Sequence, residues 1–139
     1  SSAASDVYKR QPFIVAVQNE ELLARLAKMN AEVMGVTSNP YYGAPTYILV
    51  VVSTESHNPI CDGSCVLENM MLAANALGLG TCWIHREREI FETEEGKQLL
   101  KEWGIPENVI GVGALAIGYP DGEPSPAMPR KEGYYRIIK

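Results

Sequence analysis

The sequence lacks the features that identify several large classes of protein. None of its apolar runs approaches the roughly 18 residues that a membrane-spanning helix needs. It contains no G-x-S-x-G sequence of a serine hydrolase, and no G-x-x-x-x-G-K or G-x-G-x-x-G loop for a nucleotide. Basic residues are scarce: 12 Lys and Arg stand against 17 Asp and Glu, for a formal net charge of −5. These absences argue against a membrane protein and against a general binder of nucleic acid or anionic membranes.

Cysteine and histidine are also few. Three cysteines, Cys61, Cys65 and Cys82, are an odd number, which does not suit a disulfide framework. We therefore expect reduced thiols in the cytoplasm, buried among apolar neighbours. His57 and His85 are the only histidines that could join them in a zinc site, but the C-x3-C spacing lacks a second pair of ligands. No motif of a thiol enzyme surrounds any cysteine, so we predict neither a metal site nor a catalytic thiol.

The chain has the size and composition of one globular domain, with 139 residues of which 46% are hydrophobic. Its first eleven residues, SSAASDVYKRQ, show no hydrophobic periodicity and resemble translated adapter DNA at the start of a gene model. We expect residues 1–11 to be a non-native leader, and residues 12–139 to be a domain whose N-terminal part is missing.

Strand patterns alternate with helix patterns along this domain, which indicates a sheet covered by helices on both faces, a three-layer α/β or α+β architecture. The β-branched run at 46–53 predicts a strand buried on both faces. In the last core strand, Gly111 and Gly113 are expected to leave one face bare. The expected elements are strands at 12–17, 46–53, 81–85 and 108–120, helices at 20–34, 64–77 and 93–103, loops at 35–46 and 54–63, and a final strand within 133–139.

The expected helix at 64–77 is unusually apolar, because ten of its fourteen positions are hydrophobic. Such a helix is buried nearly all round, either inside the domain or against a second subunit. It ends at Gly78-Leu79-Gly80, just before a strand. Capping a helix requires one glycine. The second glycine suggests that something flat or bulky comes close to the backbone there.

Three segments in this order, GAPTYILVVVS, DGSCVLENMMLAANALGLGTCWI and GVGALAIGYPDGEPSPAMPRK, together resemble the nitroreductase family of FMN-dependent oxidoreductases over roughly residues 12–139. The helix that ends A-x-x-L-G-L-G-x-x-W-I is the most distinctive part. The resemblance implies an α+β fold with a mixed central sheet flanked by helices. It also implies a homodimer with the active site between two subunits, which the C-terminal YYRIIK would help to join.

The resemblance also implies site residues. The glycine loop Gly78-Leu79-Gly80 would lie against the flavin ring, with a backbone N–H of Leu79 or Gly80 near the flavin nitrogen that accepts the hydride. Arg130 matches an arginine that binds the FMN phosphate, and Lys131 is a further candidate that could equally be a solvated charge.

Gln11 stands where a polar loop of the family, which touches the ring, ends in Gln-Pro. If residues 1–11 are foreign, this match is a coincidence and most of that half of the site is missing. Tyr41, Tyr42 and Trp83 could line the pocket of the electron acceptor, although core packing better suits Trp83.

The function implied is hydride transfer from NAD(P)H through FMN to a nitroaromatic, a quinone or a similar small acceptor, with no side-chain acid or base required. Two alternatives stay open. One is a flavin-binding module without turnover, and the other is a specialised member such as a dehalogenase or a flavin-destructase relative.

Overall fold

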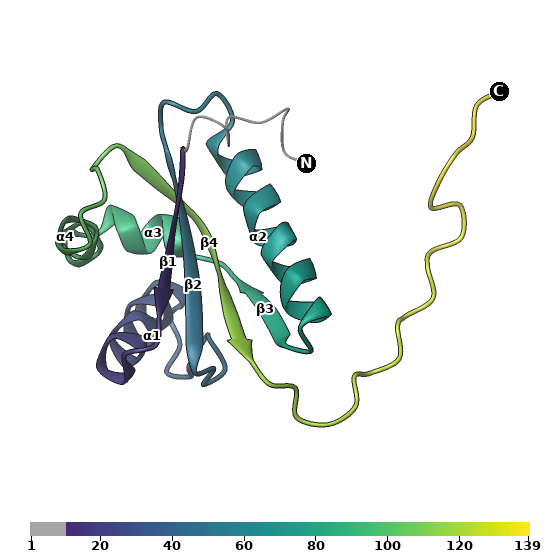
Figure 1. Cartoon of the computed structure of the whole chain (residues 1–139), viewed down its shortest axis with the longest axis horizontal. Helices are drawn as coiled ribbons and strands as arrows, with labels where there is room; N and C mark the ends of the chain where they lie inside the picture. Colours follow the sequence, from purple (N-terminus) through teal and green to yellow (C-terminus); the bar gives the residue numbers. More distant parts are fainter. Residues whose placement is uncertain (1–10) are drawn as a thin grey trace.

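A single antiparallel sheet organises the computed structural model, which describes residues 11–139. The sheet has the strand order β1-β2-β4-β3, so that β2 and β4 are central and β1 and β3 form the edges (Figure 1). All three pairings are antiparallel, where the resemblance implied a mixed sheet. In chain order the elements are β1 (Pro12–Val17), α1 (Glu20–Met34), β2 (Thr46–Ser53), α2 (Pro59–Ala76), β3 (Gly80–Ile84), α3 (Glu87–Glu92), α4 (Glu94–Glu102) and β4 (Val109–Gly118).

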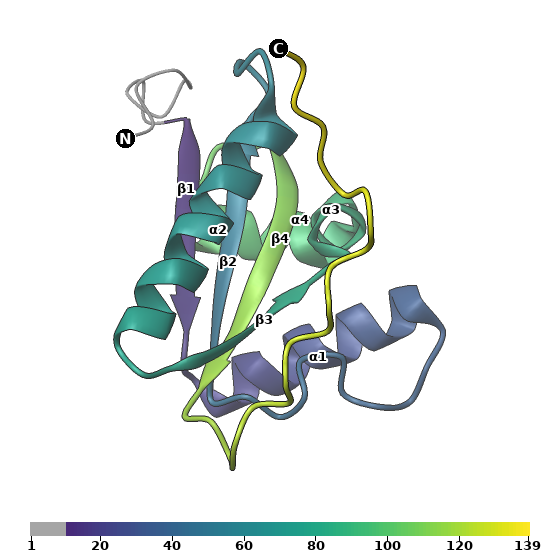
Figure 2. The ribbon, with the colours of Figure 1, turned by 90° about the vertical axis from the view of Figure 1, so that its right-hand side faces the viewer.

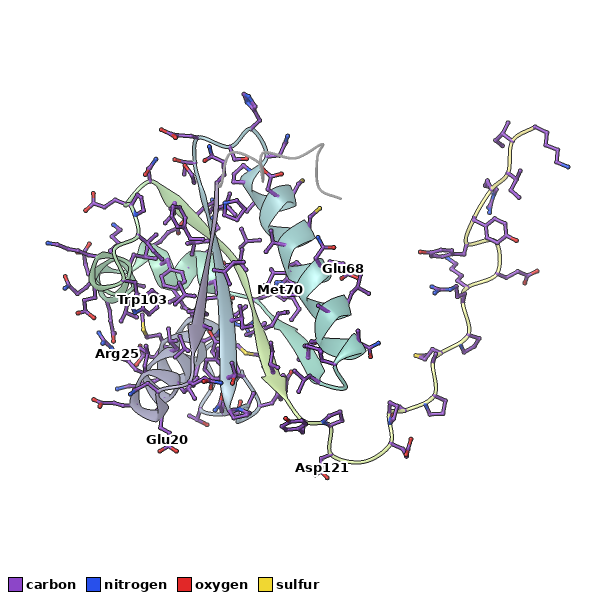
Figure 3. All side chains as sticks on the ribbon, viewed as in Figure 1. Glu20, Arg25, Glu68, Met70, Trp103 and Asp121 are labelled. Carbon is purple, nitrogen blue, oxygen red and sulfur yellow. The ribbon has the colours of Figure 1, made fainter. Side chains whose placement is uncertain are left out.

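Helices cover both faces of the sheet, which confirms the expected three-layer architecture (Figure 2). Helix α2 lies on one face, where Leu67 packs on Val50, Val52 and Leu115. In Figure 3, Met70 of α2 points toward the sheet and Glu68 points away from it. On the other face α1, α3 and α4 enclose a larger core. Strand β2 is therefore buried on both faces, as its run of β-branched residues predicts.

The predicted ends of α1 and α4 are confirmed by their caps. The Asn19 side chain accepts a hydrogen bond from the Leu22 amide at 3.0 Å, and α1 ends at Met34 before Gly35. The Thr93 hydroxyl accepts one from the Gly96 amide at 3.0 Å, which starts α4.

Helix α2 differs from the expectation in two ways. It begins at Pro59, inside the expected loop, because proline fits the first helical position, where the missing N–H would have no partner. It is also not buried all round: only Asp62, Gly63, Leu67 and Ala74 are buried among its residues. Of the two expected arrangements, burial inside its own domain is therefore wrong for the described residues, and burial against a second subunit stays a prediction. An apolar outer side, which includes Ile60 and Leu72, is left exposed.

The two glycines of β4 do not share a bare face, because a bulge intervenes. The register between β2 and β4 pairs Val50 with Gly113 but Val51 with Gly111, so Val112 is the extra residue. A Cβ at Gly113 would lie 2.6 Å from the indole nitrogen of Trp83. A Cβ at Gly111 would lie 2.4 Å from the carbonyl oxygen of Glu87, under the opposite face. Each glycine thus admits a close neighbour on its own side of the sheet.

Two further elements differ from the prediction. The six-residue helix α3 is too short to show a hydrophobic period, and the sequence did not predict it. Residues 133–139 were expected to form a strand, but within the described chain they form none. The segment after β4 runs away from the body as an extended tail (Figure 1), where a strand has no neighbour to pair with.

Candidate functional site

A groove of about 580 Å³ opens at the end of the sheet where β3 begins and β4 ends. The loop before β2 forms one wall, the start of β3 forms the other, and small residues of β4 form the floor. Volumes of roughly 300–1,000 Å³ are typical of small-molecule sites. The residues that line the groove are Tyr41, Tyr42, Gly43, Ala44, Pro45, Gly80, Thr81, Cys82, Ala116, Gly118 and Tyr119.

The loop wall of the groove is anchored by a buried pair. The Tyr41 hydroxyl donates a 2.7 Å hydrogen bond to Oε1 of Glu87, and neither side chain is exposed to solvent. The Tyr41 ring stacks on Tyr47 of β2, with 4.0 Å between the ring centroids and 12° between the planes. The other carboxyl oxygen of Glu87 is buried without a hydrogen-bond partner among the described residues.

Burial dominates the acid–base properties of this pair. It raises the pKa of Glu87 from 4.5 to about 8, against the opposing effects of the Tyr41 hydrogen bond and of the nearby Arg86 charge. Burial and the neighbouring carboxyl group also raise the pKa of Tyr41. At neutral pH Glu87 is therefore largely a neutral carboxylic acid. The sequence gives no sign of this, because Glu87 stands in a charged run, HREREIFE, that looks like a solvated surface.

A second buried side chain fixes the corner between β3 and α3. Asn30 of α1 is fully buried, donates from Nδ2 to the His85 carbonyl at 2.9 Å, and accepts from Nε of Arg86 at 2.6 Å. Arg86 has a φ of 82°, which is uncommon for a residue other than glycine. Helix α1 thus holds the segment that delivers Glu87 to Tyr41.

The residues of the glycine loop have two different roles. Gly78 has a φ of 76°, and its amide donates to the Asn75 carbonyl, while the Leu79 amide donates to the Ala74 carbonyl at 2.9 Å. This is a Schellman cap, and it occupies both amides. Gly80 alone of the three lines the groove, and a Cβ there would make ordinary contacts, the nearest at 3.6 Å from the Gly118 carbonyl oxygen. Among the described residues, neither a close contact nor a positive φ requires glycine at residue 80.

The predicted phosphate residues lie in the tail. Arg130 and Lys131 are exposed, and the Arg130 guanidinium lies 5.7 Å from the centre of the Tyr134 ring. None of the residues that line the groove is charged. The structure therefore does not bring Arg130 or Lys131 to the groove within one chain.

Gln11 lies at the opposite end of the sheet from Gly80. Its carbonyl accepts a hydrogen bond from the Ser53 amide at the end of β2, whereas Gly80 pairs with Gly118 beside the start of β2. The Gly118 row lies one residue beyond the Thr46–Ile117 pair, so eight strand steps separate it from the Ser53 row, about 26 Å. Gln11 and Gly80 of one chain therefore cannot contact the same ring. Residues 1–10 of the predicted leader lie outside the described residues, and the leader stays a prediction.

The aromatic residues predicted to line the acceptor pocket lie on both faces of the sheet. Tyr41 and Tyr42 line the groove, with Tyr42 78% exposed at its rim, whereas Trp83 packs under α2 on the other face.

All three cysteines are free and exposed, so the expectation of buried thiols is wrong. Cys61 and Cys65 lie on α2, whose outer side is uncovered, and Cys82 lies on an edge strand inside the groove.

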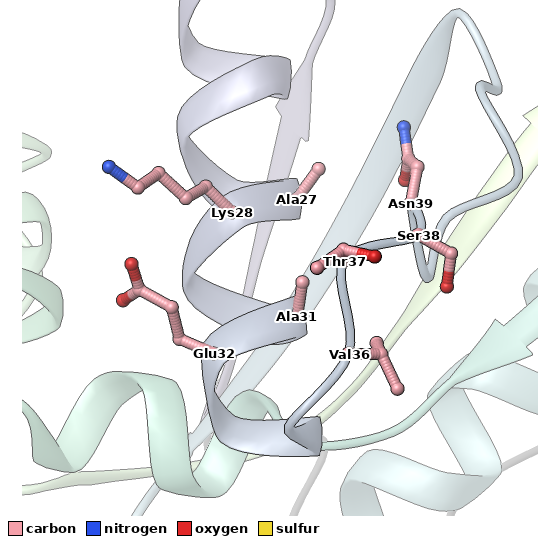
Figure 4. A pocket seen from close by; sticks show the side chains of 8 residues that line it. All are labelled: Ala27, Lys28, Ala31, Glu32, Val36, Thr37, Ser38 and Asn39. Atoms are coloured by element: carbon pink, nitrogen blue, oxygen red, sulfur yellow. The ribbon is translucent and has the colours of Figure 1, made fainter.

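Other hollows offer less chemistry. One of about 380 Å³ lies between α1 and residues 36–39, and in Figure 4 the charged ends of Lys28 and Glu32 point away from its loop side. Within residues 11–139, no group of three or more His, Cys, Asp and Glu is arranged to hold a metal ion. No helix in that range is both long and apolar enough to cross a membrane.

The groove suits one half of a flavin nucleotide. Its uncharged, aromatic and glycine-lined surface can face a planar ring, and the freedom at Gly80 leaves room for close approach. A phosphate needs charged or amide donors, which this lining lacks on its side chains. The cations would have to come from elsewhere, and Arg130 and Lys131 are the tail residues that could supply them.

Comparison with known proteins places these features in context. The sequence model of the Nitroreductase family matches residues 2–119. A protein of Archaeoglobus fulgidus, provisionally named NADH dehydrogenase/NAD(P)H nitroreductase, is 38% identical over 63 residues. The match spans 45% of this chain and about a third (34%) of that relative's length.

Solved structures agree in fold. A nitroreductase with bound FMN from Bacteroides fragilis is 28% identical and superposes with a TM-score of 0.80, over 96% of this chain and 79% of the other. An FMN-dependent nitroreductase from Clostridium difficile superposes with a TM-score of 0.76 at 24% identity, over 96% of this chain and 81% of the other. An iodotyrosine deiodinase bound to FMN and 3-iodo-L-tyrosine superposes with a TM-score of 0.68 at 19% identity, over 96% and 79%. The last two likenesses show the fold alone.

Proposed function

Because this chain belongs to the nitroreductase family, we propose that it is an oxidoreductase that binds FMN in the groove beside Gly80. FMN, when bound, supplies hydride transfer between NAD(P)H and a small acceptor such as a nitroaromatic or a quinone. We place the protein in the cytoplasm, where its exposed thiols stay reduced.

The observation that carries the proposal is the second glycine. Gly78 is explained by the helix cap, but this chain has space for a Cβ at Gly80. A residue that is glycine without an internal reason, on the wall of a groove, is explained by a flat group that must approach its backbone. The amides of Gly78 and Leu79 are used by the cap, so Gly80 is our candidate for the ring contact.

The residues around the groove then have separate tasks. Tyr42 supplies apolar ring surface and excludes water from one side of a bound molecule, and the buried Tyr41 anchors the loop that carries it. Arg130, with Lys131 beside it, neutralises the phosphate, and the extended tail gives these cations their reach. None of these tasks requires a side chain that donates or removes a proton.

We also infer that the protein is a homodimer. Helix α2 exposes Ile60 and Leu72, and its cap exposes Leu77. The tail exposes Tyr134 and Ile138, and the described residues leave all five uncovered. Exposed apolar surface of this kind marks an interface. A second copy would also allow Gln11 of one chain to approach Gly80 of the other. Light scattering at micromolar concentration should report twice the mass of the chain, and a stable monomer that reduces a quinone would refute the dimer.

The test of the cofactor compares two glycines. Gly80→Ala adds a Cβ where the ring would lie, at an expected cost of about 1–3 kcal/mol, or roughly 5- to 150-fold in FMN affinity. Gly78→Ala is the control: it strains a residue with positive φ and should lower stability while leaving FMN affinity unchanged. Affinity is measured by quenching of FMN fluorescence. Equal FMN affinity in Gly80→Ala and the unchanged protein would refute the proposal that the flavin ring lies against Gly80.

The test of turnover uses the protein loaded with FMN under anaerobic conditions. NADH or NADPH should bleach the flavin absorbance, and a quinone should restore it. Bound FMN that neither nucleotide bleaches would instead indicate a flavin-binding module without turnover.

A further inference from the structure

Glu87 is a fully buried ionisable group that the proposed chemistry does not use. It lies at the start of α3, pressed against β4, where Gly111 permits its backbone to approach. Its position is determined from both sides: the preceding residues are held by Asn30, and its carboxyl group accepts from Tyr41. A fully buried carboxyl group with one oxygen unpartnered is costly to keep.

Tyr41 connects this carboxyl group to the groove. Its carbonyl accepts from the Ala44 amide at 3.1 Å, and its own amide donates to the Asn39 side chain at 2.8 Å. The Tyr42 amide donates to the Asn39 carbonyl at 3.1 Å, and Tyr42 has a φ of 57°, a conformation that needs support from its surroundings. The turn that presents Tyr42 at the rim is therefore built around the buried Tyr41.

We propose that Glu87 is a positioning residue of the groove, which through its hydrogen bond to Tyr41 holds the loop of residues 40–45 in the shape that a bound molecule meets. The inference rests on the proposed function for the use of the groove. The holding of the loop itself is a property of this chain alone. Glu87 touches neither the groove nor anything bound in it, and acts only through Tyr41.

The holding depends on protonation. When the loop lifts, Glu87 becomes hydrated and ionises readily, whereas in the closed loop burial favours its neutral form. Rising pH therefore favours the open loop until Glu87 also ionises in the closed form. The charged or titratable groups that act on Glu87 are Tyr41 from the loop, and Arg86 and Glu89 from its own segment. Asn30 of α1 accepts a hydrogen bond from Arg86, next to Glu87, but its amide side chain does not titrate.

The first experiment needs no cofactor. Hydrogen exchange of the Tyr42 and Ala44 amides is measured from pH 5 to 8 and expressed as protection, which removes the intrinsic dependence on pH. In the unchanged protein we expect protection to fall by up to about tenfold per pH unit. In Glu87→Gln the amide oxygen still accepts from Tyr41, so the loop should stay closed with no dependence on pH.

Two further variants make this result specific. Tyr41→Phe removes the hydrogen bond and should lower protection by about 2- to 10-fold at every pH. Glu89→Gln removes an exposed carboxylate from the same helix and should behave like the unchanged protein. Equal pH dependence in Glu87→Gln and the unchanged protein would overturn the proposal, and so would a flat profile in Glu89→Gln.

The second experiment uses the protein loaded with FMN. Tyr41→Phe should raise KM for a benzoquinone about 2- to 10-fold while kcat changes less than twofold. The separate variant Glu87→Gln keeps the acceptor for Tyr41 and should have the same KM as the unchanged protein at neutral pH. A protein that binds no FMN would refute the proposed function but leave the exchange experiment to decide the role of Glu87. An unchanged KM in FMN-loaded Tyr41→Phe would overturn the effect of the loop on bound molecules.

Discussion

The buried carboxyl group of Glu87 makes the stability of this protein depend on pH in an unusual direction. Most carboxylates in proteins have lowered pKa values and stabilise the fold as pH rises. The pKa of Glu87 is instead raised to about 8 from 4.5, because burial penalises its charge. Below pH 4.5 the group is protonated in both the folded and the unfolded chain, and its contribution to stability is fully present.

Between pH 4.5 and pH 8 the unfolded chain loses this proton and the folded chain keeps it. The unfolded state therefore binds fewer protons, and the free energy of unfolding falls by about 1.4 kcal/mol per pH unit. Over the interval from 4.5 to about 8 the loss amounts to several kcal/mol. Well above pH 8 both states are ionised and the contribution no longer changes.

Urea unfolding of the unchanged protein and of Glu87→Gln, at half-unit steps from pH 4.5 to 9, isolates this contribution. Other carboxyl groups titrate equally in both proteins and cancel in the difference. Glutamine keeps the acceptor for the Tyr41 hydroxyl, so the variant should become the more stable of the two by several kcal/mol as pH rises to 8. Glu89→Gln, at an exposed position, should show no such trend. A difference that stays constant within about 1 kcal/mol between pH 5 and pH 8 would refute the raised pKa.

Three other substitutions test the packing. Leu67→Ala, in the fully buried layer under α2, should cost about 2–5 kcal/mol of unfolding free energy in urea, and a smaller loss would mean that α2 collapses into the cavity. Thr93→Ala removes the acceptor of the Gly96 amide and should cost about 1 kcal/mol, whereas Thr93→Ser should retain most of the stability. Gly113→Ala would place a Cβ 2.6 Å from the Trp83 indole nitrogen and should lower stability by about 1–3 kcal/mol with a change in tryptophan fluorescence; an unchanged spectrum would contradict this contact.

Local patterns in the sequence predicted most of the secondary structure. The caps at Asn19 and Thr93 involve residues within one helical turn, and the β-branched run of β2 is apolar because both of its faces are covered. These features depend on hydrogen bonds and burial periodicities that neighbouring residues determine. The alternation of strand and helix patterns also predicted the layers of the fold, which the structure confirms.

Chain order alone did not reveal which residues meet across the sheet. The bulge at Val112 turns Gly111 and Gly113 to opposite faces, because one extra residue in a strand reverses the alternation of its side chains. Gln11 and Gly80, grouped by the family pattern, lie at opposite ends of the sheet, a separation set by strand register.

Glu87 is the clearest case of a property that only the tertiary structure decided. In the sequence it is one acid among several in a charged segment. In the fold Asn30, 57 positions earlier in the chain, holds the neighbouring backbone, and Tyr41 covers the carboxyl group. The same residue type at Glu89, two positions later, remains in solvent. Burial, which determines the pKa, comes from neighbours that are distant in the chain, and no local pattern of residues records it.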